Sequence, residues 1–309
     1  MNSSVPVSVL IPTKNEEANI AKCLDSVSWA GEIFVVDSNS SDRTAEIARH
    51  KGAKIIPFSW NGTGPKKYNW ALENLPWRYE WVLVVDADEE VTPELAKEIA
   101  ATLAREPSSG GFLARFDYFL FGKRIRHGDP LIKPVLFKHR FTRYEKLDVP
   151  EVKEYDIEVH EQPIVRGPVG KLKSRMVHRD WVSLRHHFER HNIYSDWEAL
   201  LRTRYRDRSV ADELPPRVLG SPIQRRRFFK RLFLNLPGKP LIYFFYGFVV
   251  RLGFLDGRAG FTYNALKAIY WYQISLKEYE IGIGLKREAL ENGRMVSIES
   301  STVQKKIRL

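Results

Sequence analysis

Short apolar runs alternate with helical stretches throughout residues 1–110, and this alternation restricts the fold more than any other feature of the chain. A short continuous apolar run at residues 7–11 is typical of a strand covered on both faces, and further strands are expected at 33–36, 54–58 and 81–85. Helices are expected over residues 16–29, 44–51, 66–74 and 92–105. Alternation at this spacing predicts an α/β fold whose mostly parallel sheet is flanked by helices and joined by right-handed crossovers.

The pattern changes after residue 110. Two further strands are expected at 111–122 and 133–141, and residues 154–161 alternate between polar and apolar. A polar helix is expected over 183–206, followed by a proline-bearing linker and then by basic, aromatic segments. We therefore divide the chain into an α/β domain over residues 1–180 and a helical C-terminal region over residues 181–309.

Charge is distributed unevenly along the 309 residues, which carry a net charge of +11. Residues 1–110 contain 11 Lys and Arg against 16 Asp and Glu, so the excess of cations lies in the remainder. A basic region suits an anionic membrane, a phosphorylated substrate or nucleic acid. No helix-turn-helix, RNP or zinc-finger pattern is present, so we expect no nucleic acid partner. The single cysteine, Cys23, and the lack of a signal-peptide pattern favour a cytosolic location.

Polar side chains follow three of the four predicted strands. Pro12 and Thr13 follow the first, Asp37 the second, and Asp86 and Asp88 the fourth. The carboxyl ends of parallel strands meet at one edge of a sheet, where open α/β sheets bind their ligands. Neither GxGxxG nor GxxxxGK[ST] follows the first strand, which argues against a dinucleotide-binding dehydrogenase and a P-loop protein.

The segment WVLVVDADEE places four acids in five positions, and their mutual repulsion needs a physical reason. Two carboxylates separated by one residue can reach one divalent cation, and Mg²⁺ completes its shell with phosphate oxygens. A metal and a diphosphate would then relieve the repulsion. The alternative is that the acids cap the next helix. We assign that role to Glu89, Glu90 and Glu94, and the metal to Asp86 and Asp88.

Three blocks, VSVLIPTKNEEANIAKCLDSV, FVVDSNSSDRTAEIA and WVLVVDADEEVTPEL, resemble the inverting family-2 glycosyltransferases, which have the nucleotide-sugar-binding GT-A fold. Their order and spacing match over roughly residues 5–110. VHE at 159–161 and GFLDGRAG at 253–260 are similar to the lipopolysaccharide-core glucosyltransferase-like subgroup. Between about 120 and 150 the sequence departs from this pattern, so the donor or acceptor sugar can differ.

The resemblance implies a role for each matching residue. It places Pro12, Thr13 and Glu16 (or its neighbour Glu17) in the nucleotide pocket, and it implies that Asp37 accepts a hydrogen bond from uracil.

The same resemblance implies that Asp86 and Asp88 meet the ribose, the diphosphate and a Mg²⁺ or Mn²⁺ ion, with Asp88 the closer ligand. Lys66 and Lys67 fall in a loop that approaches the donor, where their charge suits a diphosphate; the alternative is a solvated helix start. His178 is similar to a histidine near the donor diphosphate in related enzymes, and we count it among the metal candidates, with a structural histidine as the alternative.

An inverting transfer needs a carboxylate that removes the proton from the acceptor hydroxyl. In EYDIEVHE, residues 154–161, Glu161 ends the apolar face of an alternating strand, where partial desolvation raises a carboxyl pKa and makes a better base. The VHE resemblance points to the same residue. His160 and Glu158 are the alternatives, as is a surface acid with no catalytic role.

Two further histidines, His187 and His191, lie four residues apart on one predicted helix. Phe188 stands where a zinc protease has glutamate, so we expect a polar helix surface or a substrate contact rather than zinc. Arg190 and Tyr194 are possible acceptor contacts.

Basic and aromatic residues dominate the predicted C-terminal helices. RRRFFKRLF, residues 225–233, mixes both kinds, and PLIYFFYGFVV, residues 240–250, has no charge. The apolar stretch is shorter than the ~20 residues of a spanning helix. Short apolar helices bordered by cations and rings are typical of the bilayer interface. We expect a membrane-interface subdomain, with an ordinary packed helical subdomain as the alternative.

Together these features predict a metal-dependent inverting glycosyltransferase. It would move a sugar from a nucleoside diphosphate sugar, with UDP the expected nucleotide, to a hydroxyl of a glycolipid, a lipid-linked glycan or a lipopolysaccharide-core acceptor. It would be cytoplasmic and peripheral on the inner face of the cell membrane. The alternative is a non-catalytic, membrane-associated assembly factor that binds nucleotide sugars. A nucleotidyltransferase would need a GxGTR-like loop where this chain has PTKNEE.

Overall fold

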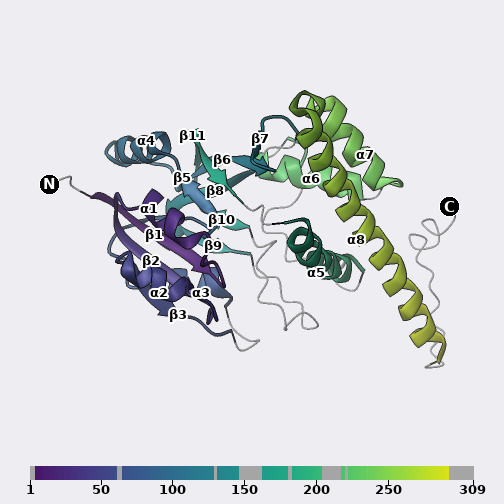
Figure 1. Cartoon of the computed structure of the whole chain (residues 1–309), viewed down its shortest axis with the longest axis horizontal. Helices are drawn as coiled ribbons and strands as arrows, with labels where there is room; N and C mark the ends of the chain where they lie inside the picture. Colours follow the sequence, from purple (N-terminus) through teal and green to yellow (C-terminus); the bar gives the residue numbers. More distant parts are fainter. Residues whose placement is uncertain are drawn as a thin grey trace.

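An α/β part and a helical C-terminal part make up the protein (Figure 1). The computed structural model describes residues 4–60, 65–128, 131–145, 162–179, 183–203, 217–219, 222–234 and 236–291.

Nine strands of the described residues form one sheet, in the order β3-β2-β1-β4-β8-β6-β11-β5 with β7 paired to β6. Their bounds are β1 Val5–Thr13, β2 Ala30–Asp37, β3 Lys54–Pro57, β4 Trp81–Val84, β5 Glu89–Val91, β6 Gly111–Leu120, β7 Lys123–Ile125, β8 Ile132–Lys138 and β11 Val169–His178. The first four strands are parallel throughout, as the alternation predicts. β8 is antiparallel to β4 and β6, and β11 is parallel to β6, so the whole sheet is mixed.

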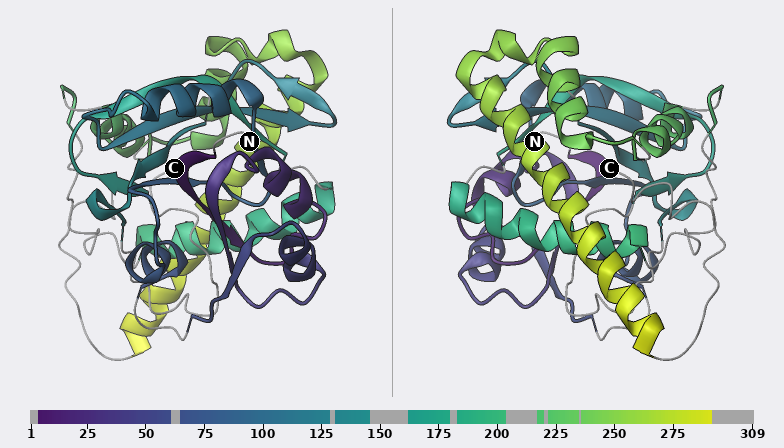
Figure 2. Two further views of the ribbon diagram at one scale, coloured as in Figure 1. Left: turned by 90° about the vertical axis from the view of Figure 1, so that its left-hand side faces the viewer. Right: turned by 90° about the vertical axis from the view of Figure 1, so that its right-hand side faces the viewer.

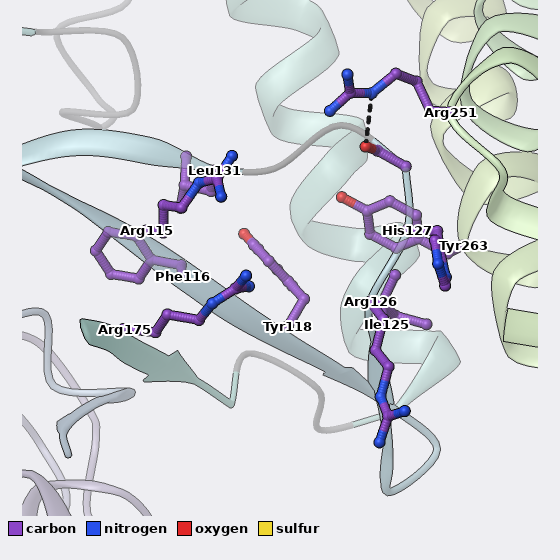
Figure 3. A pocket seen from close by; sticks show the side chains of 11 residues that line it. Arg115, Phe116, Tyr118, Ile125, Arg126, His127, Leu131, Arg175, Arg251 and Tyr263 are labelled. Carbon is purple, nitrogen blue, oxygen red and sulfur yellow. Dashed lines mark hydrogen bonds between the residues drawn. The ribbon is translucent and has the colours of Figure 1, made fainter. Parts of the chain in front are cut away.

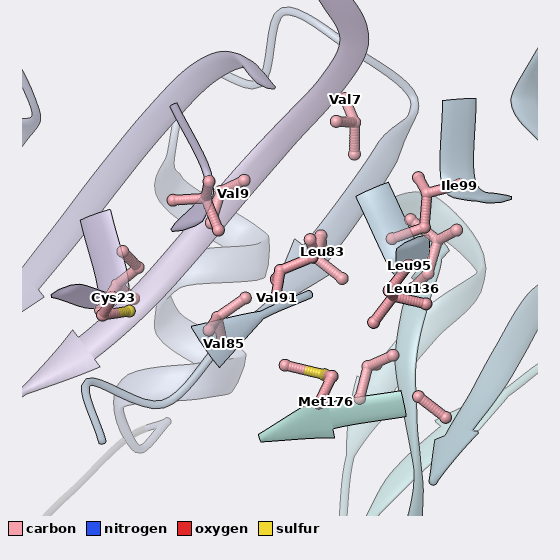
Figure 4. Close-up of a cluster of buried hydrophobic side chains, with 14 of the residues drawn as sticks. Val7, Val9, Cys23, Leu83, Val85, Val91, Leu95, Ile99, Leu136 and Met176 are labelled. Carbon is pink, nitrogen blue, oxygen red and sulfur yellow. The ribbon is translucent and has the colours of Figure 1, made fainter. Parts of the chain in front are cut away.

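Helices cover both faces of the sheet. On one face α1 (Ile20–Ser26), α2 (Thr44–His50) and α4 (Pro93–Leu103) pack on a continuous apolar core, part of which Figure 4 shows. On the other face α3 (Lys67–Asn74) packs on a second core together with the small sheet of β9 (Thr142–Tyr144) and β10 (Pro163–Val165). β4 is apolar throughout and β1 mostly so, because both strands are buried on both faces.

The loop after β1 differs from the helix predicted over residues 16–29. Asn15 has a φ of 55° and does not cap a helix; its Oδ1 accepts a hydrogen bond from the Ser41 backbone N–H at 2.8 Å. The Glu16 backbone N–H donates to Thr44 Oγ1 at 2.7 Å. The polar residues of KNEE therefore tie the β1–α1 loop to the β2–α2 loop, and the helix begins only at Ile20.

Five strands, β5, β7, β9, β10 and β11, were not expected from the sequence, and β5 and β11 bear on the site. β11 lies between β6 and β5, and it buries Leu172 and Met176 while Lys171 and Lys173 face outward. These basic residues obscure the apolar pattern, because only one face of this strand is buried. β5 pairs His178 of β11 with Glu89, directly after the predicted acidic turn.

The C-terminal region is helical, as expected. It contains α5 Leu184–Thr203, α6 Pro222–Leu234, α7 Lys239–Phe245, a π-helical turn η3 over Tyr246–Val250, a 3₁₀ turn η4 over Gly253–Asp256, and α8 Gly257–Glu291. α8 crosses α5, as Figure 2 shows, and Lys277 Nζ on α8 pairs with Asp196 on α5 at 2.6 Å. The Asp256 carboxylate accepts hydrogen bonds from the backbone N–H groups of Arg126 and His127, which docks this region on the sheet.

Among the described residues no single helix has the length and apolar character needed to cross a membrane. One bent pair, Lys239–Val250 with Gly253–Leu285, meets the length and composition test together, at an angle of 74°.

A cavity substitution tests whether β11 is an integral strand of the sheet. Met176 is fully buried, so Met176→Ala should lower the free energy of unfolding by about 3 kcal/mol through lost apolar contact and an unfilled cavity. Urea denaturation followed by circular dichroism measures this. The outward-facing neighbour Lys171→Ala should change the free energy by less than about 0.5 kcal/mol. Equal effects at both positions would contradict the placement of β11.

Candidate active site

Strand register brings the predicted strand-end residues to one edge of the sheet. β1 lies between β2 and β4, and Thr13 pairs directly with Asp37. Leu10 pairs with Val84, so Pro12 and Asp86 stand level with each other two residues further along. Pro12, Thr13, Asp37 and Asp86 therefore meet where the parallel strands end, which is the ligand-binding edge of such sheets.

Two polar groups at this edge are buried in a way that suits a ligand. Thr13 is 3% exposed, and its hydroxyl has no hydrogen-bond partner among the described residues. Asp37 is 6% exposed and accepts a hydrogen bond from the Ser40 backbone N–H at 3.0 Å. Glu16 stands in the adjoining loop and accepts a hydrogen bond from the Asn19 amide at 2.8 Å.

Cations from β8 and β11 neutralise the acidic segment that follows β4. Lys133 Nζ on β8 lies 2.7 Å from Asp86 Oδ2 and 2.8 Å from Glu89 Oε1, so one ammonium bridges two carboxylates. Arg179 pairs with Glu90 at 2.8 Å.

The prediction that Glu89 and Glu90 cap the next helix is therefore wrong. Thr92 caps α4 by accepting a hydrogen bond from the Leu95 N–H, and of the acids only Glu94 lies in the first turn. Glu89 is instead completely buried, and its second oxygen accepts a hydrogen bond from the Asp86 N–H at 3.0 Å. Its role is to fix the turn that carries Asp86 and Asp88.

The ion pair sets the protonation of both partners. Burial raises the pKa of Asp86, but the Lys133 ammonium and the hydrogen bonds from Lys133 and Tyr68 outweigh it and lower the pKa to about 2. Burial lowers the pKa of Lys133, but Asp86 and Glu89 raise it well above its ordinary value. At neutral pH Asp86 is thus held as a carboxylate and Lys133 as an ammonium.

The start of α3 lies beside the same carboxylate. The Tyr68 hydroxyl donates to Asp86 Oδ1 at 2.9 Å, and the Tyr68 ring stacks on Tyr144 at 4.4 Å. Lys66 and Lys67 directly precede Tyr68. Lys67 is 7% exposed, and Lys66 Nζ lies over the Trp60 ring at 5.7 Å. Neither side chain is therefore fully solvated, as the alternative of a solvated helix start would require.

Asp88 and His178 form the pair best suited to a divalent cation. His178 Nε2 lies 3.5 Å from Asp88 Oδ2, and His178 Nδ1 lies 3.4 Å from Glu89 Oε1. Both Asp86 oxygens face Tyr68 and Lys133, and the Asp88 carboxylate faces His178, as expected for a metal candidate. Among the described residues no group of three or more His, Cys, Asp or Glu side chains could hold a metal. A carboxylate and an imidazole suffice for an ion that takes its other ligands from phosphate oxygens.

Glu161, His160 and Glu158, the candidates for the base, lie outside the described residues. The residues that flank 146–161 are held together. The Glu145 N–H donates to the Gln162 carbonyl at 3.1 Å, and Pro163 pairs with Tyr144. Tyr144 is the residue on which Tyr68 stacks. Gln162, the next residue after Glu161, is therefore anchored near the Asp86 side of the site.

The His187 and His191 pair has a structural role. Their rings stack at 3.8 Å, and His191 Nδ1 donates to the His187 carbonyl at 2.9 Å. Burial, His187 and Lys267 lower the pKa of His191 to about 3, so it is neutral at physiological pH. His191 packs against Tyr270 of α8 and is 9% exposed, which corrects the expected polar helix surface.

Sequence reasoning missed Tyr68, Lys133 and Arg179. Lys133 carried a usable signal: it is a cation at the start of the apolar strand IKPVLFK, where a charge needs a partner. Arg179 could be found only together with β11, and nothing in the sequence marks Tyr68.

The sequence matches the model of one protein family and several glycosyltransferases of known sequence. Residues 8–153 match the model of "Glycosyl transferase family 2". A glycosyltransferase of Rickettsia typhi is 44% identical over 95 residues, which is 30% of this chain and 31% of that protein. The chain thus matches only about a third of the length of such Rickettsia relatives. The lipopolysaccharide core biosynthesis glycosyltransferase LpsC of Rhizobium meliloti is 27% identical over 302 residues, covering 91% of this chain and 94% of LpsC.

Solved structures with a similar chain path include the mannosyltransferase PcManGT from Pyrobaculum calidifontis in complex with GDP-Man and Mn²⁺. The TM-score is 0.46 at 16% identity, over 89% of this chain and 87% of that one. Glucosyl-3-phosphoglycerate synthase from Mycobacterium tuberculosis, in complex with Mn²⁺, UDP and glucosyl-3-phosphoglycerate, gives a TM-score of 0.40 at 17% identity, over 66% and 81% of the two chains.

Removing the bridging ammonium tests the electrostatic account of the site. Lys133→Met should lower the free energy of unfolding at pH 7 by about 3 kcal/mol, because the fully buried Glu89 and the half-buried Asp86 would be left without a cation. In the wild type, Asp86 has a depressed pKa, so its contribution is present above the ordinary carboxyl pKa and is lost as the pH falls from about 4 to 2. In the variant, Asp86 loses the ammonium that lowers its pKa, while burial still raises it, so the stability deficit of the variant should shrink between pH 7 and pH 5.

Urea denaturation at both pH values measures this difference. Lys138→Met is the matched control on the same strand, since Lys138 pairs at 3.2 Å with Glu80, whose side chain is 49% exposed. That pair should contribute less than about 1 kcal/mol. A Lys133→Met deficit that is small, or that does not depend on pH, would contradict the account.

Proposed function

Because this chain belongs to glycosyltransferase family 2, we propose that it transfers a sugar from a nucleoside diphosphate sugar, with UDP as the nucleotide, to a hydroxyl of a lipid-linked glycan or lipopolysaccharide-core acceptor. The reaction is a single displacement that inverts the anomeric carbon. The observation that carries the proposal is the meeting of Pro12, Thr13, Asp37 and Asp86 at one sheet edge, beside Asp88.

The nucleotide end of the donor fits the β1 and β2 side of this edge. The buried Thr13 hydroxyl, which has no partner among the described residues, and the Asp37 carboxylate offer polar contacts for a base and a ribose. No glycine-rich turn follows β1 to hold the phosphates. The diphosphate therefore belongs on the β4 side, next to Asp88 and the start of α3.

Asp88 and His178 are the residues that would hold a Mg²⁺ or Mn²⁺ ion, which supplies neutralising charge for the leaving diphosphate when bound. Lys133 keeps Asp86 ionised, and Tyr68 orients it toward the donor. Lys66 and Lys67 add positive charge at the start of α3. Glu161 takes the proton from the acceptor hydroxyl as that oxygen attacks the anomeric carbon, with His160 as its neighbour at the site.

The C-terminal helices bring the protein to an anionic bilayer at the inner face of the membrane. Large apolar side chains at 39–67% exposure gather over α6, α7, η3 and η4, at the end of the molecule next to β7 (Figure 1): Phe229, Leu232, Leu236, Leu241, Ile242, Phe245, Tyr246, Val249, Val250, Leu252, Phe254 and Leu255. The same segments carry exposed arginines: Arg225 and Arg231 on α6, Arg251 directly after η3 and Arg258 at the start of α8. An apolar face accompanied by cations fits a bilayer surface with anionic headgroups.

Release of UDP tests the enzymatic proposal. With Mn²⁺, a panel of UDP-sugars and a lipopolysaccharide-core or lipid-linked acceptor fraction, the wild type should release UDP, and Asp88→Asn should release it at least roughly a hundredfold more slowly because charge stabilisation of the diphosphate is lost. Asp25→Asn is the control, since Asp25 pairs with Lys51 on the surface. No release by the wild type, or undiminished release by Asp88→Asn, would refute the proposal.

Glu161→Gln separates an enzyme from a non-catalytic nucleotide-sugar binder. The variant of an enzyme should lose UDP release and still bind UDP with unchanged affinity, because the base contacts the acceptor rather than the nucleotide. A wild type that binds UDP-sugar without any turnover would support the assembly factor instead.

Vesicle sedimentation tests the membrane-facing surface. Phe245→Ser and Leu255→Ser should each weaken binding to phosphatidylglycerol-containing vesicles by roughly tenfold, because each removes an apolar side chain that the bilayer would bury. Leu184→Ser, at the start of α5 and 46% exposed, is the matched control and should have no effect. Equal binding by all three variants would place the membrane contact elsewhere.

A further inference from the structure

A cavity apart from the candidate active site lies between the nine-stranded sheet and the C-terminal helices. Its volume is about 170 Å³, and none of the residues assigned to the donor lines it. Arg115, Phe116 and Tyr118 of β6 and Arg175 of β11 form the sheet side, and Arg251 and Tyr263 close it from the C-terminal region: Figure 3 shows these side chains together with Ile125, Arg126, His127 and Leu131.

Positive charge dominates this cavity, since four arginines line it and none of the described lining residues is an acid. His127 also lines it, and its Nδ1 lies 3.1 Å from Asp256 Oδ1. Arg175 pairs with Asp117 at 3.0 Å, but Asp117 is shared with Arg124 at 2.8 Å. Within the described ranges Arg115 has no carboxylate partner. Arg251 has none there either; its Nε donates to the Gly128 carbonyl at 3.1 Å, the dashed line of Figure 3. The cavity thus holds cationic donors, Arg115 and Arg251, that no carboxylate of the described residues neutralises.

The arrangement of these donors suits an oxyanion. In Figure 3 the guanidinium groups of Arg115 and Arg175 extend to either side of the Tyr118 hydroxyl, and Arg251 reaches in from the C-terminal region, whereas Arg126 runs away from this group. Guanidinium groups bind phosphate oxygens through paired, charge-assisted hydrogen bonds.

The cavity adjoins both the donor site and the apolar C-terminal face. The Tyr118 ring stacks on His178 at 4.8 Å, and His178 is the residue next to Asp88. Lys133 Nζ lies over the ring of Phe116, another lining residue, at 5.1 Å. On the far side, Arg251 directly follows the exposed Val249 and Val250 of η3. A ligand in the cavity would therefore lie between the acidic turn and the apolar face.

We propose that this cavity binds a phosphate monoester carried by the acceptor, so that the acceptor is a phosphorylated glycan or glycolipid. Binding of a phosphate here follows from the arginines alone, whereas its role in positioning the acceptor rests on the function proposed above. The phosphate can be carried by a lipid headgroup or by the sugar itself, and the experiment separates these two sources.

The test compares Arg115→Gln/Arg175→Gln with the wild type in the full chain. Calorimetry with glucose 1-phosphate should show binding to the wild type, and the double variant should bind at least roughly tenfold more weakly because two charge-assisted contacts are lost. Arg124→Gln is the matched control: it removes the other partner of Asp117 without touching the cavity and should bind normally. UDP with Mn²⁺ should bind all three proteins equally.

A parallel measurement with vesicles identifies the source of the phosphate. Phosphatidic acid presents a phosphate monoester and phosphatidylglycerol only a diester. Selective loss of binding to phosphatidic acid vesicles in the double variant supports a lipid-borne phosphate. Loss of glucose 1-phosphate binding with unchanged vesicle binding supports a phosphate on the sugar.

Three results would overturn the proposal. The first two are no glucose 1-phosphate binding by the wild type and undiminished glucose 1-phosphate binding by the double variant. The third is an equal loss of UDP binding in the double variant, which would mean that the cavity binds the donor. A wild type that binds glucose 1-phosphate but neither binds nor turns over UDP-sugars would instead defeat the function proposed above. Should the double variant fail to fold, phosphate protection of Arg115 and Arg175 against phenylglyoxal in the wild type, mapped by mass spectrometry, decides the question, and lack of protection overturns the proposal.

Discussion

One ammonium group makes the acidic edge of this sheet possible. Lys133 of β8 bridges Asp86 and the fully buried Glu89, and without it two carboxylates would face each other in a poorly solvated turn. Burial of charge is tolerated only where a partner of opposite sign and hydrogen bonds compensate it. Because Lys133 satisfies that requirement within the protein, the turn can hold Asp86 ionised and present Asp88 beside His178 before any ligand arrives.

The strands around this ion pair explain why the sheet is mixed. The parallel strands β2, β1 and β4 supply the residues that we propose bind the nucleotide, at the edge where open α/β sheets bind their ligands. β8 enters antiparallel to β4 and brings Lys133, and β11 pairs with β5 and brings His178 and Arg179. The second half of the sheet thus carries the cations that neutralise the acids supplied by the first half.

The sequence predicted the part of the site that depends on local pattern. Strand-ending polar residues such as Asp37 and Asp86 follow unbroken apolar runs, so the parallel sheet and its binding edge could be placed from periodicity alone. The missed Lys133 lies on β8, and the missed Arg179 directly follows β11, a strand with only a single apolar face. The pairing of such strands is set by tertiary packing rather than by local propensity. The sequence analysis expected a metal ion and a diphosphate to offset the repulsion among the acids. In the structure, the Lys133 ammonium already offsets the charges of Asp86 and Glu89.

The central claim is that the edge formed by β1, β2 and β4 binds a nucleoside diphosphate with a divalent cation. A crystal structure of the protein with UDP and Mn²⁺ tests it most directly. We expect the uracil next to Asp37 and the diphosphate next to Asp88, with anomalous scattering from manganese between the phosphates and that carboxylate. Nucleotide bound away from Asp37 and Asp88, or bound there equally well in a matched crystal prepared with EDTA, would contradict the account.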